Sequence, residues 1–247
     1  MSVGVLALQG SYNEHVATLK RLGVEAIEVR KPEQLEGLSA LIIPGGESTT
    51  MAKLAAQYNL IPALRDFGSS GKPIWGTCAG LIFLADNVLG QKKGGQDLIG
   101  GLDCTVHRNF FGSQLYSFET ELAVPALAAT EGGPSSFRTV FIRAPAILET
   151  GPAVEVLADY TVTNGDEGNN GQKVAVAVKQ GNLLATAFHP ELTSDSRWHS
   201  YFLKMIQGQA ASDVVCSTKS GDRMPDPVVQ RKELPIFRGS DRLSFEL

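Results

Sequence analysis

A cysteine between small residues, in the segment Gly76-Thr77-Cys78-Ala79-Gly80, is the part of the 247-residue chain best suited to chemistry. It follows a short apolar run and precedes a stretch that favours a helix, so we expect a sharp turn from strand to helix at Cys78. Such a turn projects the thiol, and a helix N-terminus stabilises the thiolate. The pattern predicts a nucleophile, whereas the alternative for a free cysteine is a buried core position.

A cysteine nucleophile needs a base, and His189 is the histidine best placed to supply one. It follows the apolar run 183–187, at the carboxyl end of a predicted strand. Pro190 favours an extended segment there, in which Glu191 points to the same side as His189 and orients its ring. The sequence therefore predicts a triad of Cys78, His189 and Glu191. His15 and His199 fall on predicted helices, where we expect solvated or interfacial side chains.

Acyl transfer from an amide also needs donors for the oxyanion. The turn Pro44-Gly45-Gly46-Glu47-Ser48 follows another apolar run. Its glycines can direct an N–H group toward the site, and Ala79 supplies a second N–H at the start of its helix. Turns of this composition commonly end strands and by themselves indicate no function. The predicted position of this turn beside Cys78 is therefore what indicates a role as an oxyanion hole. We expect the oxyanion hole to consist of the N–H groups of Gly46 and Ala79.

The elements that must position these residues alternate in the first half of the chain. Strands are predicted at 3–8, 26–29, 40–43 and 73–75, and helices at 12–22, at 48–57 with an N-cap in Ser48-Thr49-Thr50, and from about residue 79. This pattern is typical of an α/β fold with an open, mostly parallel, flavodoxin-like sheet and flanking helices. The carboxyl ends of such strands meet at one edge, which brings Cys78 and the glycine turn together.

The second half of the chain is richer in predicted strands, at 102–106, 115–122, 154–160, 174–178 and 183–187. A helix at about 194–206 closes the domain, and the polar segments 128–136 and 164–172 are interpreted as surface insertions. Periodicity ends near Gln209. We therefore expect a domain at 1–208 followed by a loosely ordered C-terminal extension at 209–247.

Composition excludes several classes of protein. The net charge is -4 and no basic run is present, which argues against nucleic acid or an anionic membrane surface as the partner. No apolar stretch approaches the roughly 18 residues of a membrane span, and no signal peptide is recognisable. Three cysteines without CxxC spacing indicate neither a disulfide framework nor a zinc site. We expect a cytoplasmic protein that binds no metal, and inert thiols at Cys104 and Cys216.

Several motifs together resemble a known family. The cysteine turn, Gly45-Gly46-Glu47-Ser48 and His189-Pro190-Glu191 are similar to those of class I glutamine amidotransferases. The resemblance narrows to the glutaminase subunits of pyridoxal 5'-phosphate synthase, the Pdx2 or SNO family, through the segments 5–10, 44–51, 107–112 and 140–145. The overall sequence is most similar to plant members of that family. The resemblance covers residues 3 to about 206. The two insertions and the C-terminal extension depart from the compact bacterial form.

The resemblance implies roles for named residues. Cys78, His189 and Glu191 match the triad, and a further set matches the positions that contact glutamine: Gly46, Glu47, Ser48, Arg108, Ile142 and Arg143. Either arginine can pair with the substrate α-carboxylate, and Glu47 can hold the α-ammonium group. Without the surrounding motifs, a surface salt bridge would be the better explanation of each arginine.

The function implied is hydrolysis of L-glutamine to L-glutamate and ammonia through a cysteinyl thioester, with no metal or organic cofactor. The family delivers the ammonia to a Pdx1-type barrel subunit in a hetero-oligomeric complex, for vitamin B6 biosynthesis. Two alternatives remain open at this point: another hydrolase with a cysteine at a strand-to-helix turn, and a non-catalytic regulatory subunit. Turnover of glutamine against peptides separates the first, and replacement of Cys78 separates the second.

Overall fold

The computed structural model describes residues 1–91, 94–111, 117–162 and 171–217, with side chains described as far as residue 208. Most of the predicted insertion at 164–172 lies outside these residues. The predicted extension at 209–247 lies outside them beyond Ser217, and the expectation for its order therefore stays untested.

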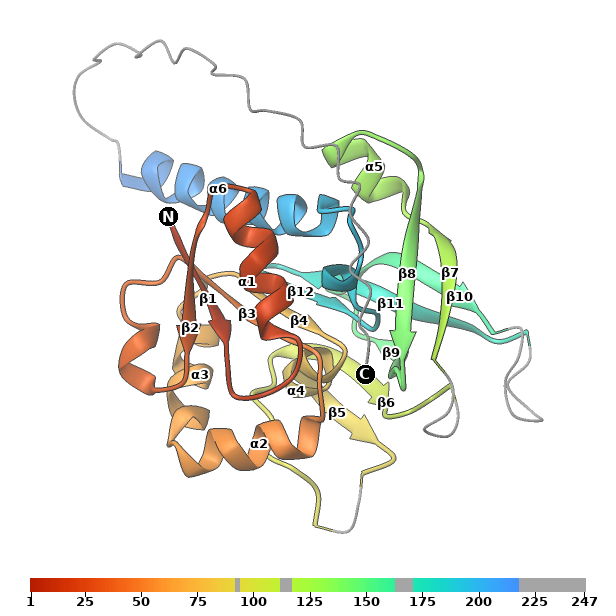
Figure 1. Cartoon of the computed structure of the whole chain (residues 1–247), viewed down its shortest axis with the longest axis horizontal. Coiled ribbons are helices and arrows are strands. Elements are labelled where there is room, and N and C mark those ends of the chain that lie inside the picture. The colour runs from red at the N-terminus through yellow and green to blue at the C-terminus, as the bar shows by residue number, and fades with distance from the viewer. Residues whose placement is uncertain (92–93, 112–116, 163–170, 218–247) are drawn as a thin grey trace, which may run out of the picture.

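A ten-stranded sheet forms the centre of the described chain, in the order β2-β1-β3-β4-β12-β11-β9-β6-β5 with β10 beside β11 (Figure 1). The strands are β1 (Ser2–Leu6), β2 (Glu25–Val29), β3 (Ala40–Ile43), β4 (Ile74–Thr77), β5 (Ala85–Leu89), β6 (Leu102–His107), β9 (Ala146–Thr150), β10 (Glu155–Thr161), β11 (Lys173–Gln180) and β12 (Leu183–Thr186). All pairs from β2 to β12 are parallel. The pairs that join β12, β11, β9 and β6 are antiparallel. The predicted α/β fold class is confirmed.

Helices cover both faces of this sheet. They are α1 (Tyr12–Arg21), α2 (Ser48–Gln57), α3 (Leu60–Ser69), α4 (Ala79–Leu84), α5 (Pro125–Glu131), α6 (Arg197–Ser217) and the 3₁₀ helices η1 (Pro32–Leu35) and η2 (Pro190–Leu192). Figure 1 shows α1 beside α6, on the opposite side of the sheet from α2 and α3. The rings of His15 on α1 and His199 on α6 are in contact, which fixes this arrangement.

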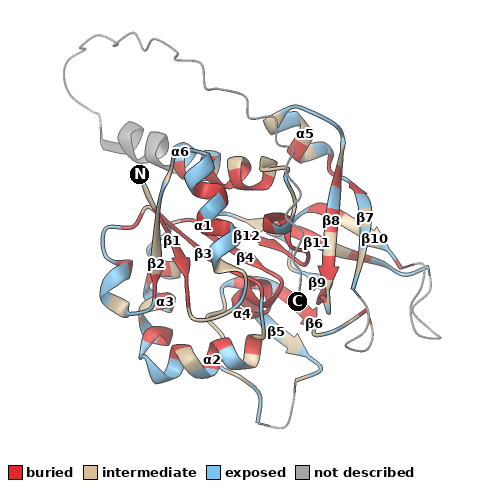
Figure 2. Ribbon diagram, in the orientation of Figure 1, coloured by how far each residue is buried: buried red, intermediate tan, exposed pale blue. Residues whose placement is uncertain are grey.

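The central strands are buried on both faces, as Figure 2 shows by their red colour. Every residue of β3, β4 and β12 is buried. Side chains alternate along a strand, so Trp75 and Thr77 of β4 face α1 and α6, while Ile74 and Gly76 face α3 and α4. Burial on both sides explains why these strands have continuous apolar sequences instead of alternating ones.

A second, two-stranded sheet stands beside the main one. It pairs β7 (Ser117–Ala123) with β8 (Ser136–Ile142) in antiparallel fashion, over the aromatic side chains of Phe111, Phe118, Phe141 and Tyr160. The rings of Phe118 and Phe141 are stacked with centroids 4.7 Å apart. This cluster holds the end of β8, which carries Ile142, against the main sheet.

Several elements differ from the sequence predictions. The segment expected as an insertion at 128–136 contains the end of α5 and the start of β8. Neither of these elements was predicted, nor were α3, β5 and β9. Helix α6 begins at Arg197 instead of about Ser194 and continues to Ser217 instead of ending near Ile206. No proline lies between Ile206 and Ser217, and alanines there favour continued helix. Helix α2 has its predicted span, but its N-cap is Glu47 and not Ser48.

Candidate active site

Cys78 lies at the predicted sharp turn between β4 and α4. Its φ of 48° and ψ of -98° are a strained conformation for a residue other than glycine. A Cβ on Gly80 would overlap the carbonyl oxygen of Ile43, and one on Gly76 would overlap the backbone of Gly80. The Cys78 N–H also donates to the Thr186 carbonyl oxygen at 2.7 Å. The small residues therefore let helix and strands approach closely enough to hold the thiol at the sheet edge.

The ring of His189 and the carboxylate of Glu191 are in direct contact, with 2.7 Å between Nδ1 and Oε1. Their backbone differs from the extended segment predicted from Pro190, because Pro190–Leu192 forms the 3₁₀ helix η2. Proline at the first position suits a helix start, where its missing N–H has no partner to lose. The His189 N–H donates to the Val140 carbonyl oxygen at 2.9 Å, which ties η2 to β8.

The charges of the three side chains are coupled. Burial by itself lowers the pKa of His189, but the negative charge and hydrogen bond of Cys78, and those of Glu191, outweigh it and raise this pKa to about 10. Burial likewise raises the pKa of Glu191, yet the interaction with the neighbouring His15, the charge and hydrogen bond of His189 and the hydrogen bond from Ser11 lower it to about 2. At neutral pH His189 is therefore an imidazolium and Glu191 a carboxylate.

A cavity of about 360 Å³ opens over Cys78 and brings together most of the predicted site. Its lining includes eight of the ten predicted residues: Gly46, Glu47, Ser48, Cys78, Arg108, Ile142, Arg143 and His189. The other two, Ala79 and Glu191, lie behind this lining, each at least 95% buried. Ala79 is the first residue of α4, so its N–H has no acceptor within the helix. The predicted residues thus form one site.

The glycine turn after β3 is held by residues near the start of the chain. The Ser11 N–H donates to the Gly45 carbonyl oxygen at 3.1 Å, and the Glu47 N–H donates to Gln9 Oε1 at 3.0 Å. Gly46 has a φ of 156° and lies against the Gln9 amide, where a Cβ would overlap it. Gly45 lies so close to the His189 ring that it too has no room for a Cβ. The glycine turn is therefore in contact with the ring of His189, the predicted base.

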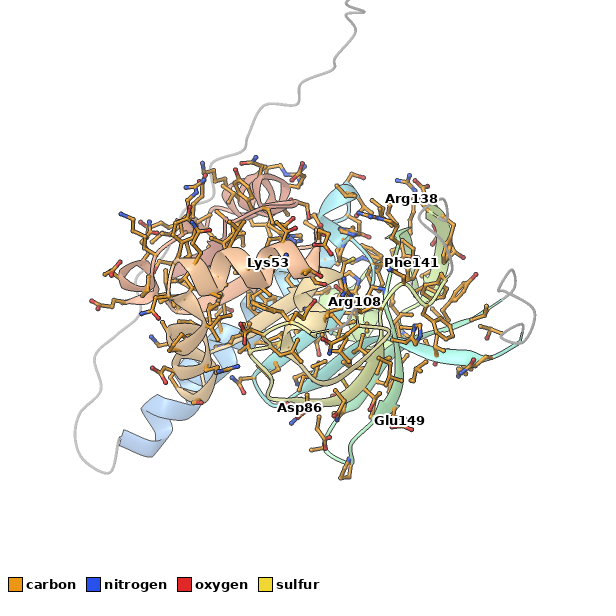
Figure 3. All side chains as sticks on the ribbon, turned by 90° about the horizontal axis from the view of Figure 1, so that it is seen from below. Lys53, Asp86, Arg108, Arg138, Phe141 and Glu149 are labelled. Atoms are coloured by element: carbon orange, nitrogen blue, oxygen red, sulfur yellow. The ribbon has the colours of Figure 1, made fainter. Side chains whose placement is uncertain are left out.

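Opposite charges face each other at the rim of the cavity. Glu47 Oε2 accepts from the N–H and hydroxyl of Thr50 at 2.7 and 2.9 Å, which makes Glu47 the N-cap of α2. Its other oxygen, Oε1, lies 3.2 Å from the Arg108 guanidinium. The side chain of Arg108 is 10% exposed and that of Glu47 is 43% exposed. In the view of Figure 3, Arg108 lies in the middle of the molecule, between Lys53 and Phe141.

The end of β8 supplies the opposite wall. The Ile142 carbonyl oxygen lies 3.9 Å from Cys78 Sγ. Arg143 follows with a φ of 46°, the left-handed region that side chains other than glycine and asparagine seldom adopt. Such strain is typical of residues at functional sites. The stacked rings beneath this segment, with Phe141 among them, hold it in place.

Three polar residues around Glu191 were not identified from the sequence as part of the site. Ser11 Oγ donates to Glu191 Oε1 at 2.5 Å, across 180 positions of sequence. His15 and His199 are fully buried behind Glu191, which corrects the expectation of solvated or interfacial histidines. Helical periodicity could have signalled this, because His15 and Leu19 share one face of α1 and both are buried.

Of the two other cysteines, the structure describes the side chain of Cys104 only. Cys104 is buried on β6, and burial raises the pKa of its thiol to about 12, in keeping with the expected inert thiol. The side chain of Cys216 lies outside the described residues. Among the residues that are described, no group of histidine, cysteine, aspartate and glutamate side chains could hold a metal ion. The described helices include none with both the length and the apolarity to cross a membrane.

The site and fold match a family of known proteins. The model of the SNO glutamine amidotransferase family matches residues 5–208. A probable pyridoxal 5'-phosphate synthase subunit PDX2 from Arabidopsis thaliana is 59% identical, over 96% of this chain and 100% of its own length. The pyridoxal 5'-phosphate synthase subunit PdxT from Pelotomaculum thermopropionicum is 50% identical, over 83% of this chain and 94% of its own.

Solved structures agree with these matches. A crystal structure described as a glutamine amidotransferase is 48% identical, with a TM-score of 0.71 over 83% of this chain and 98% of that one. A putative GMP synthase subunit from Thermoplasma acidophilum shares the fold at 17% identity and a TM-score of 0.58. With a nucleophile turn, a histidine–carboxylate pair and a glycine turn at one sheet edge, the chain belongs to the SNO glutamine amidotransferase family.

Proposed function

We propose that Cys78, His189 and Glu191 are the catalytic triad with which this glutamine amidotransferase hydrolyses L-glutamine to L-glutamate and ammonia. The observation that carries the proposal is the coupling of the three groups at one cavity, where His189 lies 2.7 Å from Glu191 and is held cationic by Cys78. An imidazolium beside a thiolate supplies both the nucleophile and the proton that this reaction needs.

The reaction follows from these protonation states. The Cys78 thiolate attacks the carbonyl carbon of the glutamine side chain, and the N–H groups of Gly46 and Ala79 stabilise the oxyanion. The tetrahedral intermediate collapses as His189 gives its proton to the departing nitrogen, which releases ammonia and leaves a γ-glutamyl thioester. His189, now neutral, takes a proton from water, which attacks the thioester and releases glutamate. Glu191 keeps the ring in the required tautomer throughout.

The charged pair at the rim suits the head group of the substrate. Free glutamine carries an ammonium and a carboxylate on its α-carbon, so its charges complement those of Glu47 and Arg108, which now face each other at 3.2 Å. Substrate binding would exchange one ion pair for two, with Arg143 as the other candidate for the carboxylate. The remaining proposed contacts come from Gly46, Ser48 and Ile142, which line the same cavity.

The relatives at 59% and 50% identity are named as subunits of pyridoxal 5'-phosphate synthase, which supports a role for this chain in vitamin B6 synthesis. The partner proposed is the barrel subunit of Pdx1 type, in a hetero-oligomeric complex that receives the ammonia. We place the complex in the cytoplasm, because three cysteines without CxxC spacing suit a reducing compartment. We also propose residues 1–208 as the glutaminase domain and 209–247 as an extension of it, since the family match ends at residue 208.

The test is glutamate release from glutamine by wild type and by Cys78→Ala, each alone and with the barrel subunit. We expect Cys78→Ala to lose hydrolysis while it keeps its melting temperature and its partner, because the turn accepts a small side chain. Residual turnover well above background in a folded variant would place the nucleophile elsewhere. Turnover of peptides instead of glutamine would favour a different cysteine hydrolase, and indifference to the substitution would favour a regulatory subunit.

A further inference from the structure

The two carboxylate oxygens of Glu191 have unequal surroundings. Oε1 accepts from Ser11 Oγ at 2.5 Å and lies 2.7 Å from His189 Nδ1. Oε2 is buried and makes no hydrogen bond with any residue that the structure describes. The ring nitrogen Nε2 of His15 lies 3.4 Å from it, and both side chains are completely buried. A buried carboxylate oxygen without a donor is costly, so this contact calls for a physical account.

His15 is in turn held by groups on two other elements. Its Nε2 also lies 3.3 Å from the hydroxyl oxygen of Thr77, on β4. Its Nδ1 lies 2.9 Å from Nε2 of His199, on α6. The edge of Trp75 packs against both imidazole rings, with centroid distances of 5.5 and 4.9 Å. The His15 ring is therefore fixed in orientation, with Nε2 near both the Thr77 hydroxyl and Glu191 Oε2.

The hydrogen-bond pattern assigns the tautomers of both histidines. Nδ1 of His199 has no partner among the described residues. A buried N–H without an acceptor is rarer than a bare lone pair, so the proton of neutral His199 belongs on Nε2. That proton is donated to Nδ1 of His15, and neutral His15 then carries its own proton on Nε2. His199 thus donates a hydrogen bond to His15, and the N–H of His15 in turn faces Glu191.

The charge state of the pair agrees with this assignment. Burial lowers the pKa of His15 against the opposing charges of Glu191 and Glu14. Burial and the neighbouring His15 lower the pKa of His199 well below its usual value. Both rings are therefore neutral at neutral pH, and each has one donor and one acceptor. The positive charge that balances Glu191 comes from His189, on the other side of the carboxylate.

We propose that His15 is a positioning residue of the active site: its Nε2–H group holds the second oxygen of Glu191, and His199 fixes the tautomer that makes this possible. The inference rests on the proposed function, since it assigns a role in the same triad. A carboxylate held at both oxygens cannot rotate away from the His189 ring. The contact matters most at the thioester stage, when His189 is neutral and Glu191 depends on neutral donors alone.

The kinetic test compares His15→Leu with His15→Gln in the complex with the partner synthase. Leucine fills the space without a donor, and we expect kcat to fall roughly tenfold or more, the effect of leaving a buried charged acceptor unpaired. KM should change little, because His15 does not line the cavity. The side-chain amide of glutamine can place an N–H near the position of Nε2, and most of the lost kcat should return in His15→Gln.

Phe202→Leu is the matched control for lost packing. Phe202 lies on α6, is fully buried and contacts the Trp75 ring at 5.7 Å, and its side chain has no polar group with which to join the hydrogen bonds around Glu191. This variant should lose thermal stability and keep its kcat. If Phe202→Leu lost as much kcat as His15→Leu at a similar melting temperature, packing would explain both variants, and the positioning role would be overturned.

A spectroscopic test does not depend on activity. The ring nitrogens of isotope-labelled histidine report the tautomer by NMR, and His15→Leu identifies the His15 signals among those of the four histidines. We expect neutral His15 with its proton on Nε2. A proton on Nδ1 would point the lone pair at Glu191 and overturn the proposal.

The outcomes separate this inference from the function on which it rests. Hydrolysis retained by Cys78→Ala would remove the proposed nucleophile and, with it, the triad that His15 is meant to serve. An inactive Cys78→Ala together with a His15→Leu variant as fast as wild type would leave the triad in place and refute only the role of His15.

Discussion

Strand β4 is packed in opposite ways on its two faces. Toward α4, Gly76 and Gly80 have no room for a Cβ, and the contact is between backbones. Toward α1 and α6, Thr77 and Trp75 meet the buried polar rings of His15 and His199. The thiol of the next residue, Cys78, thus lies against closely packed backbone on one face, and the carboxylate of Glu191 lies among polar side chains on the other.

This difference separates the stability of the fold from the orientation of the reacting groups, two properties that mutations usually affect together. Close backbone packing contributes mainly to the free energy of unfolding, because a misfit there displaces a whole helix. A buried hydrogen-bonded network contributes mainly orientation, because its net stabilisation is small but its geometry is specific. Changes on the polar face should therefore lower rates more than stability, and changes on the glycine face should do the reverse.

Glu191→Gln gives the largest expected effect on the polar face. The amide keeps the size of the carboxylate but cannot stabilise the His189 imidazolium or enforce its tautomer. We expect kcat for glutamine to fall by about 10²–10⁴ with a smaller change in KM. Steady-state kinetics with the partner present measures both. A raised KM with an unchanged kcat would mean that Glu191 binds substrate and does not orient His189.

The partner subunit should raise the rate of glutamine hydrolysis by acting on the glycine turn, which lies at the sheet edge where the two faces meet. The Gly45 carbonyl oxygen is held by the Ser11 N–H at 3.1 Å, and glycines allow the following peptide to flip at little steric cost. We expect a poorly formed oxyanion hole in the free subunit, and selection of the competent state when the synthase binds. One oxyanion donor is worth about 10²–10³ in rate. Equal kcat with and without saturating partner would show that the hole is preformed.

Gly80→Ala tests the glycine face. The new methyl group would overlap the Ile43 carbonyl oxygen, so we expect a loss of about 1–3 kcal/mol in the free energy of unfolding. Gly68→Ala on α3 is the matched control, because its methyl group meets only the Ile74 side chain at an ordinary 3.6 Å. It should gain roughly 0.5 kcal/mol from helix propensity. Denaturant unfolding compares the two, and equal effects would contradict the contrast between the faces.

The last prediction concerns the acid dependence of stability. The pKa of Glu191 is lowered from 4.5 to about 2 in the folded chain, so the unfolded chain binds more protons between these values. Its contribution to stability is present above pH 4.5 and is lost as the pH falls toward 2. In Glu191→Gln the free energy of unfolding should lose this part of its dependence on pH. In Gly80→Ala it should be lowered by a similar amount at every pH. Parallel unfolding curves for wild type and Glu191→Gln would exclude Glu191 as the source.

The sequence was sufficient to predict the parts of the site that depend on local order. A strand followed by a small residue and a helix forces the turn at Cys78, and parallel strands bring such turns to one edge. The contact between His189 and Glu191 was also expected, although the helix η2 provides it and not an extended segment. Residues two positions apart can be in contact in an extended segment and in a 3₁₀ helix. The predicted contact was therefore correct, although the predicted backbone conformation was wrong.

Other features depend on packing between distant segments, which local patterns do not encode. His15 and His199 are 184 positions apart and become buried only because α1 and α6 lie side by side on β4. Helix α3 follows α2 after a short turn at Asn59, whose left-handed conformation no glycine signalled. The end of α6 was misplaced because loss of amphipathic periodicity was taken as loss of helix, whereas the helix continues to Ser217.

Ser11 gives the site a common support. Its N–H binds the Gly45 carbonyl oxygen, next to the proposed oxyanion hole, and its hydroxyl binds Glu191, behind the proposed base. Ser11 therefore contacts both the turn of the proposed oxyanion hole and the carboxylate behind the proposed base, and we expect a disturbance of one to reach the other. Such an arrangement resists partial activation: the glutaminase should exist as competent or idle, with few intermediate forms that waste glutamine. A double-mutant cycle between Ser11→Ala and Glu191→Gln measures this coupling, and strictly additive losses in rate would show that the anchor is not shared.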